Sequence, residues 1–153
     1  MKLWEDSLFV DALKLEKLYR SCVREAVGSI RLTPNEIDVL LFLSCNAPHH
    51  DTATDIAAAR GISKALVARS VDCLHRRGFL EGERDENDRR IIHLRLCGEG
   101  IEIAEQLQQK CGQVASQLQQ GIPAEELKAV HAIIKKMRRN LDTVLQNTER
   151  QVK

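Results

Sequence analysis

Residues 53–96, ATDIAAARGISKALVARSVDCLHRRGFLEGERDENDRRIIHLRL, change their hydrophobic period once, at Gly78. Before Gly78 the apolar residues recur at the three- and four-residue spacings of helices, and after it they alternate as they do in strands. Thr52 and Ser63 are suitable N-cap residues for two short helices, and Gly61 separates the two. The stretch therefore predicts a pair of short helices followed directly by a β-hairpin.

The inward positions of the two helices predict that they pack closely against each other. Ala57 stands where they cross, and only a small side chain fits at that point. The other inward positions are apolar as well: Ile56, Ile62, Val67, Val71 and Leu74. Two short helices joined by a turn that contains glycine have the pattern of a helix-turn-helix, and a hairpin directly behind them makes a winged helix.

The hairpin is predicted from two short strands, residues 79–84 and 91–96, joined by the polar loop DENDRR of residues 85–90. Alternation in the second strand places three aliphatic side chains on one face and two polar ones on the other, namely Ile92, Leu94 and Leu96 against His93 and Arg95.

Two longer helices are predicted before this stretch. Residues 3–28 carry an apolar stripe at helical spacing, which is typical of an amphipathic helix. Thr33 and Glu36 form a capping box with Pro34 at the first helical position, so the next helix begins at residue 34 and runs to about residue 45.

Two further helices are predicted after the hairpin, over residues 99–120 and 124–147, with GIP at 121–123 between them. Apolar residues of the last helix recur at alternating spacings of three and four, as in a coiled coil. They are Leu127, Val130, Ile134, Met137, Leu141 and Val144. Because apolar faces from both chain ends exceed what a small winged helix can cover, we expect a homodimer. One compact monomeric bundle is the alternative.

The predicted fold class is mainly α: a winged helix-turn-helix with a small β-hairpin wing and with N- and C-terminal dimerisation helices. Residues 1–32 and 99–153 are expected to form the helical dimerisation region, and residues 33–98 the DNA-binding domain. The dimerisation residues are expected to include Leu8, Leu15, Leu127, Ile134, Met137 and Leu141.

The composition narrows the class of protein. Aromatic residues make up 3% of the chain and the net charge is +1, so any basic surface must be local. Five cysteines without a Cys-x-x-Cys pair argue against a disulfide framework or zinc knuckle and fit a reducing cytoplasm. We expect a soluble, cytoplasmic protein without a membrane segment. No phosphate-cradling loop or nucleophile elbow is present, so we expect no enzyme, cofactor or metal.

In this order of elements the sequence resembles the MarR family of winged-helix transcription regulators. The resemblance is carried by LTPNEIDVLLFL (residues 32–43), by residues 53–96 and by Gly100. Its most specific part is the Asp-x-x-Asp-x-Arg pattern of Asp85, Asp88 and Arg90. It implies a homodimer that binds pseudo-palindromic operator DNA, and a repressor that a small phenolic or lipophilic ligand releases.

The chain departs from the family pattern at several positions on the second short helix and at the end of the hairpin. The family often has a threonine at Leu66, a serine or threonine at Ala68, and a leucine at Ser70, and Cys97 replaces a usual threonine. Fewer hydroxyls on the second helix weaken the expectation of ordinary phosphate and base contacts from that face.

A locally basic segment is expected to contact DNA. Residues 60–77 hold five cations against one acid, Asp72, for a local charge of +4. Arg69 is the best candidate for reading guanine, because its guanidinium can donate to two acceptors at once. Leu66 and its alanine neighbours could contact thymine methyl groups instead. The expected contact residues are Ser63, Lys64, Ala65, Ala68, Arg69 and Arg76.

The acids of the DENDRR loop would repel phosphate if they were free. We therefore expect Asp85 and Asp88 to accept hydrogen bonds from loop amides or from an arginine, and so to fix the loop and aim an arginine into the minor groove. The family resemblance implies that Arg90 enters the groove and that Arg89 contacts the backbone. A charge-balanced turn with no partner is the alternative.

Three other readings of the sequence compete with DNA binding and its control by a ligand. The neutral net charge and the hydroxyl-poor helix would also suit a winged-helix module for protein interaction. Cys22 and Tyr19 on the first helix could belong to a thiol-based redox sensor, which needs an accessible, electropositive setting. The HHD of residues 49–51 could suggest a metal, although adjacent loop histidines rarely chelate together.

Overall fold

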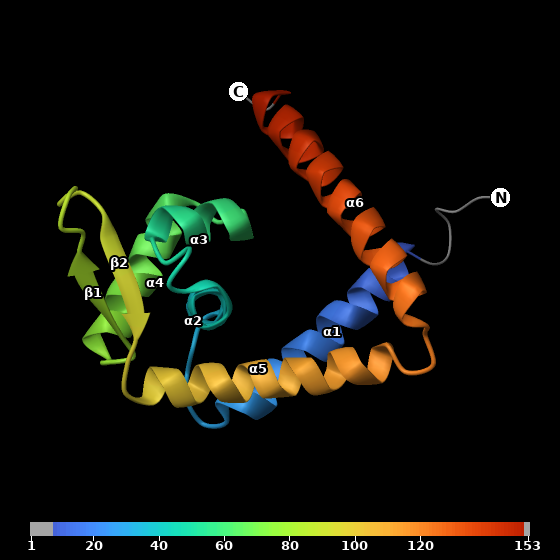
Figure 1. Cartoon of the computed structure of the whole chain (residues 1–153), viewed down its shortest axis with the longest axis horizontal. Helices are drawn as coiled ribbons and strands as arrows, with labels where there is room; N and C mark the ends of the chain where they lie inside the picture. The colour runs from blue at the N-terminus through green and yellow to red at the C-terminus, as the bar shows by residue number, and fades with distance from the viewer. Residues whose placement is uncertain (1–7, 152–153) are drawn as a thin grey trace. The chain divides into compact units, whose positions relative to one another are not determined.

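The computed structural model describes residues 8–151 (Figure 1). The elements are α1 (Leu8–Val27), α2 (Pro34–Asn46), α3 (Ala53–Arg60), α4 (Lys64–Arg76), β1 (Leu80–Arg84), β2 (Ile92–Leu96), α5 (Glu99–Leu118) and α6 (Ala124–Gln151). The predicted fold class is confirmed, and so is the type of each predicted element. The start of the first helix, at residues 3–7, lies outside the described residues.

The chain forms two compact units, Met1–Gln113 and Val114–Lys153. The first unit contains the winged helix together with α1 and most of α5, and the second contains α6. None of the described helices is both long and apolar enough to cross a membrane. The division into a dimerisation region and a DNA-binding domain stays a prediction.

Both predicted capping boxes are present. Thr33 Oγ1 accepts the N–H of Glu36 at 3.3 Å, and a Glu36 carboxylate oxygen accepts the N–H of Thr33 at 2.7 Å. Thr52 and Asp55 make the same exchange at 3.2 and 3.1 Å. Since the first N–H groups of a helix have no partner inside it, these side chains fix where α2 and α3 begin.

The turn between α3 and α4 is built from a glycine and a serine cap. Gly61 has φ 65°, in the left-handed region that favours glycine, and Ser63 Oγ accepts the N–H of Leu66 at 3.3 Å. The inward residues of the two helices are buried in one core, or packed against it, as predicted: Ile56, Ala57, Ile62, Val67, Val71 and Leu74. Their packing fixes the orientation of α4.

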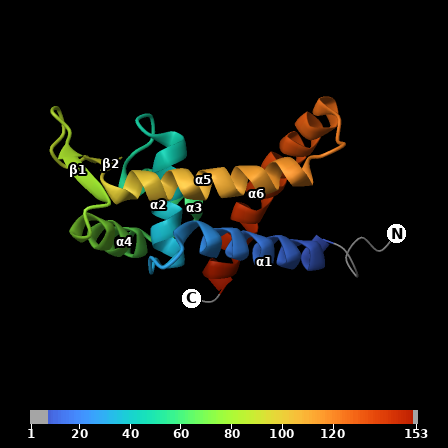
Figure 2. The same cartoon turned by 90° about the horizontal axis from the view of Figure 1, so that it is seen from below.

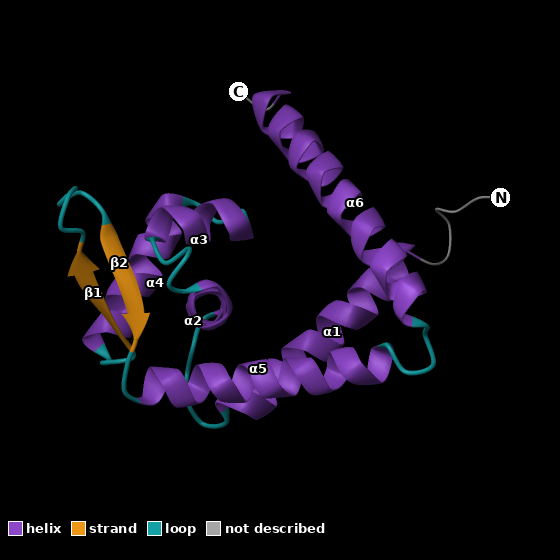
Figure 3. Ribbon diagram, viewed as in Figure 1, coloured by secondary structure: helices purple, strands orange, loops and turns teal. Residues whose placement is uncertain are grey.

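The wing is a two-stranded antiparallel hairpin that pairs Leu80 with Leu96 and Arg84 with Ile92 (Figure 3). Leu94 is buried, and Leu96 is half-buried. Ile92 is 47% exposed, because it lies at the end of β2 next to the wing loop. The side chains of Ile92 and Leu94 both lie beside Gly82, in keeping with the predicted alternation.

Both flanking helices of the first unit contribute to the core of the winged helix. Val23, Ala26 and Val27 of α1 share one cluster with residues of α5, namely Ile103, Ala104 and Leu107. This part of α5 runs alongside α1, and Lys110 Nζ lies 3.4 Å from a Glu25 carboxylate oxygen (Figure 2). The winged helix is therefore anchored to the helices expected to form the dimer.

Apolar residues remain exposed on α1 and α6. Leu15 is 50% exposed, and on α6 the exposed residues of the predicted seam are Val130, Ile134, Met137, Leu141 and Val144. Leu127 is half-buried. The side chain of Leu8 lies outside the described residues. What covers these faces stays a prediction.

Gly100, near the start of α5, lies directly against the backbone of Phe79, the residue after Gly78. A Cβ at Gly100 would lie 1.9 Å from the carbonyl oxygen of Phe79, far inside van der Waals contact. Gly112, in the same helix, has nothing within 4 Å of its Cβ position. The two glycines therefore provide a matched pair of positions at which to compare substitution by alanine.

We expect Gly100→Ala to lower the free energy of unfolding by about 1–3 kcal/mol, because backbone must shift to admit the methyl group. Gly112→Ala should raise it by about 0.5–1 kcal/mol, because alanine is the better helix former. Urea denaturation at one protein concentration measures both. Equal midpoints for the two variants would contradict the close contact between Gly100 and Phe79.

Candidate functional site

The outward face of α4 carries every residue expected there. Ser63, Lys64, Ala65, Ala68, Arg69 and Arg76 are all exposed. Val67, Ser70 and Leu74 face inward and are buried. The helix therefore presents one face of cations and small apolar groups, and its contacts with a partner stay a prediction.

Several cations of the basic segment already have partners within the chain. Arg77 donates to the carbonyl oxygen of Arg31 at 2.8 Å and lies 4.5 Å from the ring centre of Phe79. Arg60 forms an ion pair with Asp38 at 3.8 Å. The local charge of +4 thus overstates what is available to a ligand, because two of its five cations serve the fold.

Lys64 and Arg69 differ from these two arginines. Within the described part of the chain, neither side chain takes part in an ion pair or hydrogen bond. Arg76 is engaged only with its own helix, through a 3.3 Å hydrogen bond to the carbonyl oxygen of Asp72. Three exposed cations on one helix are therefore available to bind an anion.

The wing loop is closed by its own backbone and carboxylates. Asp85 donates its N–H to the carbonyl oxygen of Ile91 at 3.1 Å. Asp85 Oδ1 accepts the N–H groups of Asn87 and Asp88 at 2.8 and 2.7 Å, and Asp88 Oδ1 accepts that of Arg90 at 3.0 Å. The amides of Asp88 and Asn87, followed by His93, lower the pKa of Asp85. Two acids of the loop are thus turned towards its own backbone.

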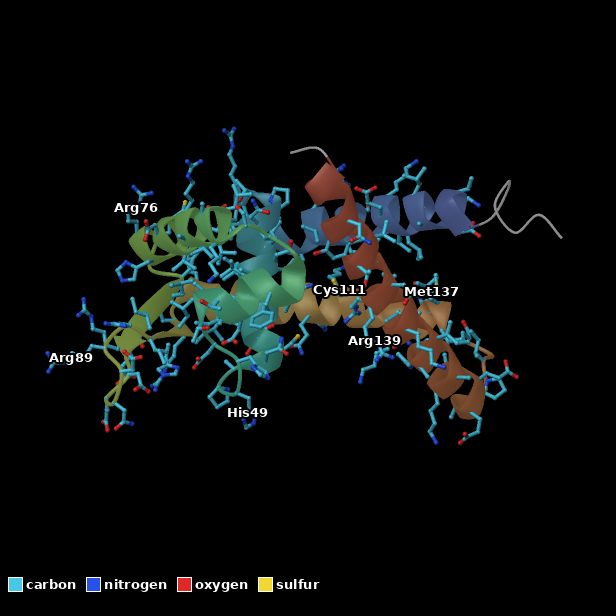
Figure 4. The ribbon with its side chains drawn as sticks, turned by 90° about the horizontal axis from the view of Figure 1, so that it is seen from above. His49, Arg76, Arg89, Cys111, Met137 and Arg139 are labelled. Atoms are coloured by element: carbon cyan, nitrogen blue, oxygen red, sulfur yellow. The ribbon has the colours of Figure 1, made fainter. Side chains whose placement is uncertain are left out.

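Arg89 and Arg90 are exposed on this loop, and neither guanidinium forms a hydrogen bond or ion pair within residues 8–151. In Figure 4, Arg89 on the wing and Arg76 on α4 both project away from the ribbon. The winged-helix unit thus offers exposed cations from two elements. The inserted role of Arg90 stays a prediction.

Sequence reasoning missed the residue that ties the wing to the body. His93 Nδ1 lies 2.7 Å from Asp51 Oδ1, and His93 Nε2 lies 3.2 Å from Asp85 Oδ2. The carbonyl oxygen of Asp51 also accepts the N–H of Leu94 at 2.8 Å. The sequence predicts that Asp85 accepts hydrogen bonds from loop amides or from an arginine. It accepts them from loop amides, and its second oxygen contacts a histidine. Only the outward position of His93 in its strand hinted at this.

The histidines of the HHD sequence are exposed, and His50 Nδ1 lies 3.9 Å from Asp55 Oδ1. No group of three or more potential metal ligands occurs among the described residues. Asp51, the third residue of this sequence, is buried and is committed to His93 and Leu94.

Two of the five cysteines, Cys73 and Cys111, lie in surroundings that do not favour a thiolate. Cys22 is buried. Burial, followed by the charge of neighbouring Cys22, raises the pKa of Cys111, and a hydrogen bond with Glu36 raises that of Cys73. A redox-sensing thiol needs the opposite shift. The structure gives the redox alternative no support at these two thiols.

A cavity of about 420 Å³ lies between α1 and α2. Its lining is Glu16, Tyr19, Arg20, Val23, Arg24, Val27, Leu32, Pro34, Ile37 and Asp38. Burial, followed by the charge of Asp38, raises the pKa of the Tyr19 phenol, and burial also raises that of Asp38. The lining residues come from α1, from α2 and from the segment between them.

The helix pair, the hairpin behind it and the exposed cations define a winged helix-turn-helix protein. Residues 32–91 match the model of the MarR family. This match covers the helix-turn-helix and the first part of the wing.

Solved structures agree with this fold over most of the chain. A complex of S. aureus MepR with DNA has a TM-score of 0.72 at 18% identity and covers 87% of this chain and 94% of that one. Streptococcus pneumoniae FabT in complex with DNA has a TM-score of 0.67 at 19% identity, covering 89% and 94%. A MarR protein from Peptoclostridium difficile has a TM-score of 0.71 at 16% identity, covering 94% and 92%.

We expect iodoacetamide at neutral pH to alkylate exposed Cys45 before Cys73 and Cys111, because a raised pKa leaves less thiolate. Peptide mass spectrometry of a timed reaction measures the order. Faster labelling of Cys22 or Cys111 than of Cys45 would restore the redox-sensor alternative. Denatured protein, in which all five thiols react alike, is the control.

Proposed function

We propose that this chain is a sequence-specific DNA-binding transcription regulator, a repressor that acts as a homodimer on pseudo-palindromic operators. One observation carries the proposal: Lys64 and Arg69 on α4, and Arg89 and Arg90 on the wing, are exposed and have no partner within the described part of the chain. Arg60, Arg77 and Arg95 nearby are paired within the fold. A winged helix whose remaining cations point outward from two elements is suited to a duplex, which offers phosphates and two grooves.

In this proposal α4 enters the major groove. Lys64, near the N-terminus of the helix, contacts phosphate, and Arg69 donates to the two acceptors on guanine. Leu66, 41% exposed beside two alanines, contacts thymine methyl groups. Because this face has few hydroxyls, base discrimination rests on one guanidinium and on apolar contacts.

The wing supplies the second contact. Its loop carries Arg89 and Arg90 on a backbone that Asp85 and Asp88 hold through three N–H groups. A loop fixed in this way loses little entropy when an arginine enters a narrow minor groove. Arg90 is proposed for the groove and Arg89 for the phosphate backbone.

Dimerisation supplies the symmetry that an operator requires. The exposed apolar residues of α1 and α6 are the proposed interface, since large exposed apolar faces mark sites of association. A two-fold axis would then place two α4 helices about 34 Å apart, one helical turn of DNA. A phenolic or lipophilic ligand in the α1–α2 cavity would act on the helix that links the interface to the winged helix.

A second candidate is a winged-helix module that binds protein and no DNA. The net charge of +1 and the hydroxyl-poor face of α4 favour it. The two candidates differ in their dependence on salt. Binding to phosphates releases counterions and weakens steeply as salt rises, whereas the second candidate predicts no complex with DNA at low salt.

Replacing the unpaired arginines should weaken operator binding by about 1–3 kcal/mol each, for Arg69→Ala and Arg90→Ala. Arg60→Ala and Arg95→Ala are matched controls, because Arg60 is paired with Asp38 and Arg95 with Glu83. We expect less than about 0.5 kcal/mol from each control. Fluorescence anisotropy with the DNA upstream of the chain's own gene, at about 50 and about 200 mM salt, measures affinity and salt slope.

Arg69→Ala should also relax base preference at one operator position. Equal binding by wild type, the two variants and the two controls would contradict the assignment of these arginines. The absence of any complex at low salt would favour the protein-interaction candidate.

Placing a charge in the α6 seam should separate the dimer. Met137→Glu should weaken association by at least about 3 kcal/mol, because the carboxylate would be buried without a partner. Ala132→Glu introduces the same group at an exposed position on the opposite face of α6 and serves as the control. Sedimentation velocity measures the state of each variant. A Met137→Glu protein that remains dimeric would place the interface elsewhere.

A further inference from the structure

His93 lies between two carboxylates that come from different parts of the fold. Asp51 precedes α3 and has a side chain that is 9% exposed, whereas Asp85 begins the wing loop and is 27% exposed. The imidazole contacts Asp51 at 2.7 Å through Nδ1 and Asp85 at 3.2 Å through Nε2. It is therefore a bridge between the helical body and the loop that carries Arg89 and Arg90.

The number of donors on the imidazole decides whether this bridge is complete. An ionised carboxylate only accepts hydrogen bonds, so each of the two contacts requires an N–H on the ring. The imidazolium has two N–H groups, but neutral imidazole has one. Because the contact with buried Asp51 is the shorter, a neutral ring keeps its proton on Nδ1. Its Nε2 lone pair then faces the Asp85 carboxylate, and that contact is lost.

We propose that His93 is a positioning residue for the wing, and that its protonation couples operator affinity to pH by holding Asp85 in place. The proposal rests on the DNA-binding function proposed above. Asp85 is the means of coupling, because its other oxygen accepts the N–H groups of Asn87 and Asp88. When Nε2 becomes an acceptor, repulsion acts on the same carboxylate that orders the arginine-bearing loop.

The other charged groups near His93 are paired among themselves. Glu83 lies opposite His93 in the hairpin register, but its carboxylate pairs with Arg95 at 2.9 Å. The end of α2 and the loop after it face His93 across an open cavity, and apart from Asp51 they contribute only apolar residues there: Leu43, Ala47 and Pro48. Asp51 and Asp85 therefore dominate the electrostatic surroundings of the ring.

The sign of the pH dependence follows from both partners. The hydrogen bond with Asp51, and after it that with Asp85, raises the pKa of His93 above its ordinary value. Its contribution is therefore fully present below the ordinary pKa and is lost as pH rises through the raised one. The pKa of Asp85 is lowered, so its contribution is lost only in acid. Affinity should fall on the alkaline side of neutrality.

The test is a DNA-binding profile by anisotropy between about pH 6 and about pH 8.5, the range in which histidine titrates. Wild type should bind roughly tenfold more weakly at the upper end, since one proton per wing limits the slope. His93→Gln should bind with the same weak affinity throughout. His49→Gln is the control and should keep the wild-type profile, because the exposed His49 side chain forms no hydrogen bond or ion pair within the described residues.

Asp85→Asn gives a sharper test. The amide oxygen still accepts the N–H groups of the loop, while its NH₂ group can donate to the lone pair of neutral His93. This variant should therefore lose the alkaline weakening that wild type shows. If it weakens with pH as wild type does, the proposal is overturned.

A readout without DNA separates this inference from the proposed function. NMR of the free protein follows the ring of His93 and the amides of Asn87, Asp88 and Ile91 through the same titration. The amides should shift with the ring in wild type and remain still in His93→Gln. If the amide signals do not shift as His93 titrates, the inference is overturned even if the protein binds DNA. Coupled amides in a protein that binds no DNA at any pH overturn the proposed function alone.

Discussion

The burial of one face of α4 determines what the rest of the molecule can present. Val67 and Leu74 are fully buried, and they pack into the same core as Ile56 and Ala57 of α3. A helix of this length cannot turn about its axis without exposing those side chains, at a cost of about 1.5–3 kcal/mol for each large aliphatic group. The outward direction of Lys64 and the other cations is therefore a consequence of packing. The same core also receives the ends of α1 and α5, so the face is fixed relative to both.

Ion pairs and hydrogen bonds within the chain then determine which charged side chains remain available to a partner. The arginines at the ends of the two short helices are held by Asp38 and by the carbonyl oxygen of Arg31, whereas those in the middle of α4 and at the wing tip are not. On the wing, acids that would repel phosphate are engaged by backbone N–H groups. A chain with a net charge of +1 can thus present a cationic face, because Asp85 and Asp88 beside the wing arginines are engaged by backbone N–H groups.

Local signals in the sequence were sufficient for the elements but not for the contacts between them. Capping residues, hydrophobic period and glycine positions act within a few residues, and the helices and strands begin and end within a few residues of the predicted positions. The bridge from Asp51 to His93 spans 42 residues, and that from Arg77 to Arg31 spans 46. Spacing along the chain carries no information about such pairs. The exposure of Ile92 could not be predicted for a related reason, since alternation gives the face of a strand but not how far the hairpin extends.

Because α4 has few hydroxyl groups, affinity for DNA should depend more on the order of the wing loop than it would in a hydroxyl-rich winged helix. Alanines and Leu66 can distinguish thymine methyl groups but add little binding to the phosphate backbone, so affinity depends more on the few unpaired cations. Two of those cations lie on a loop whose order depends on Asp85. Asp85 in turn contacts the body of the protein through a single titratable ring. A change of one proton at His93 is therefore amplified, because the loop it steadies carries a large share of the groups available to bind DNA.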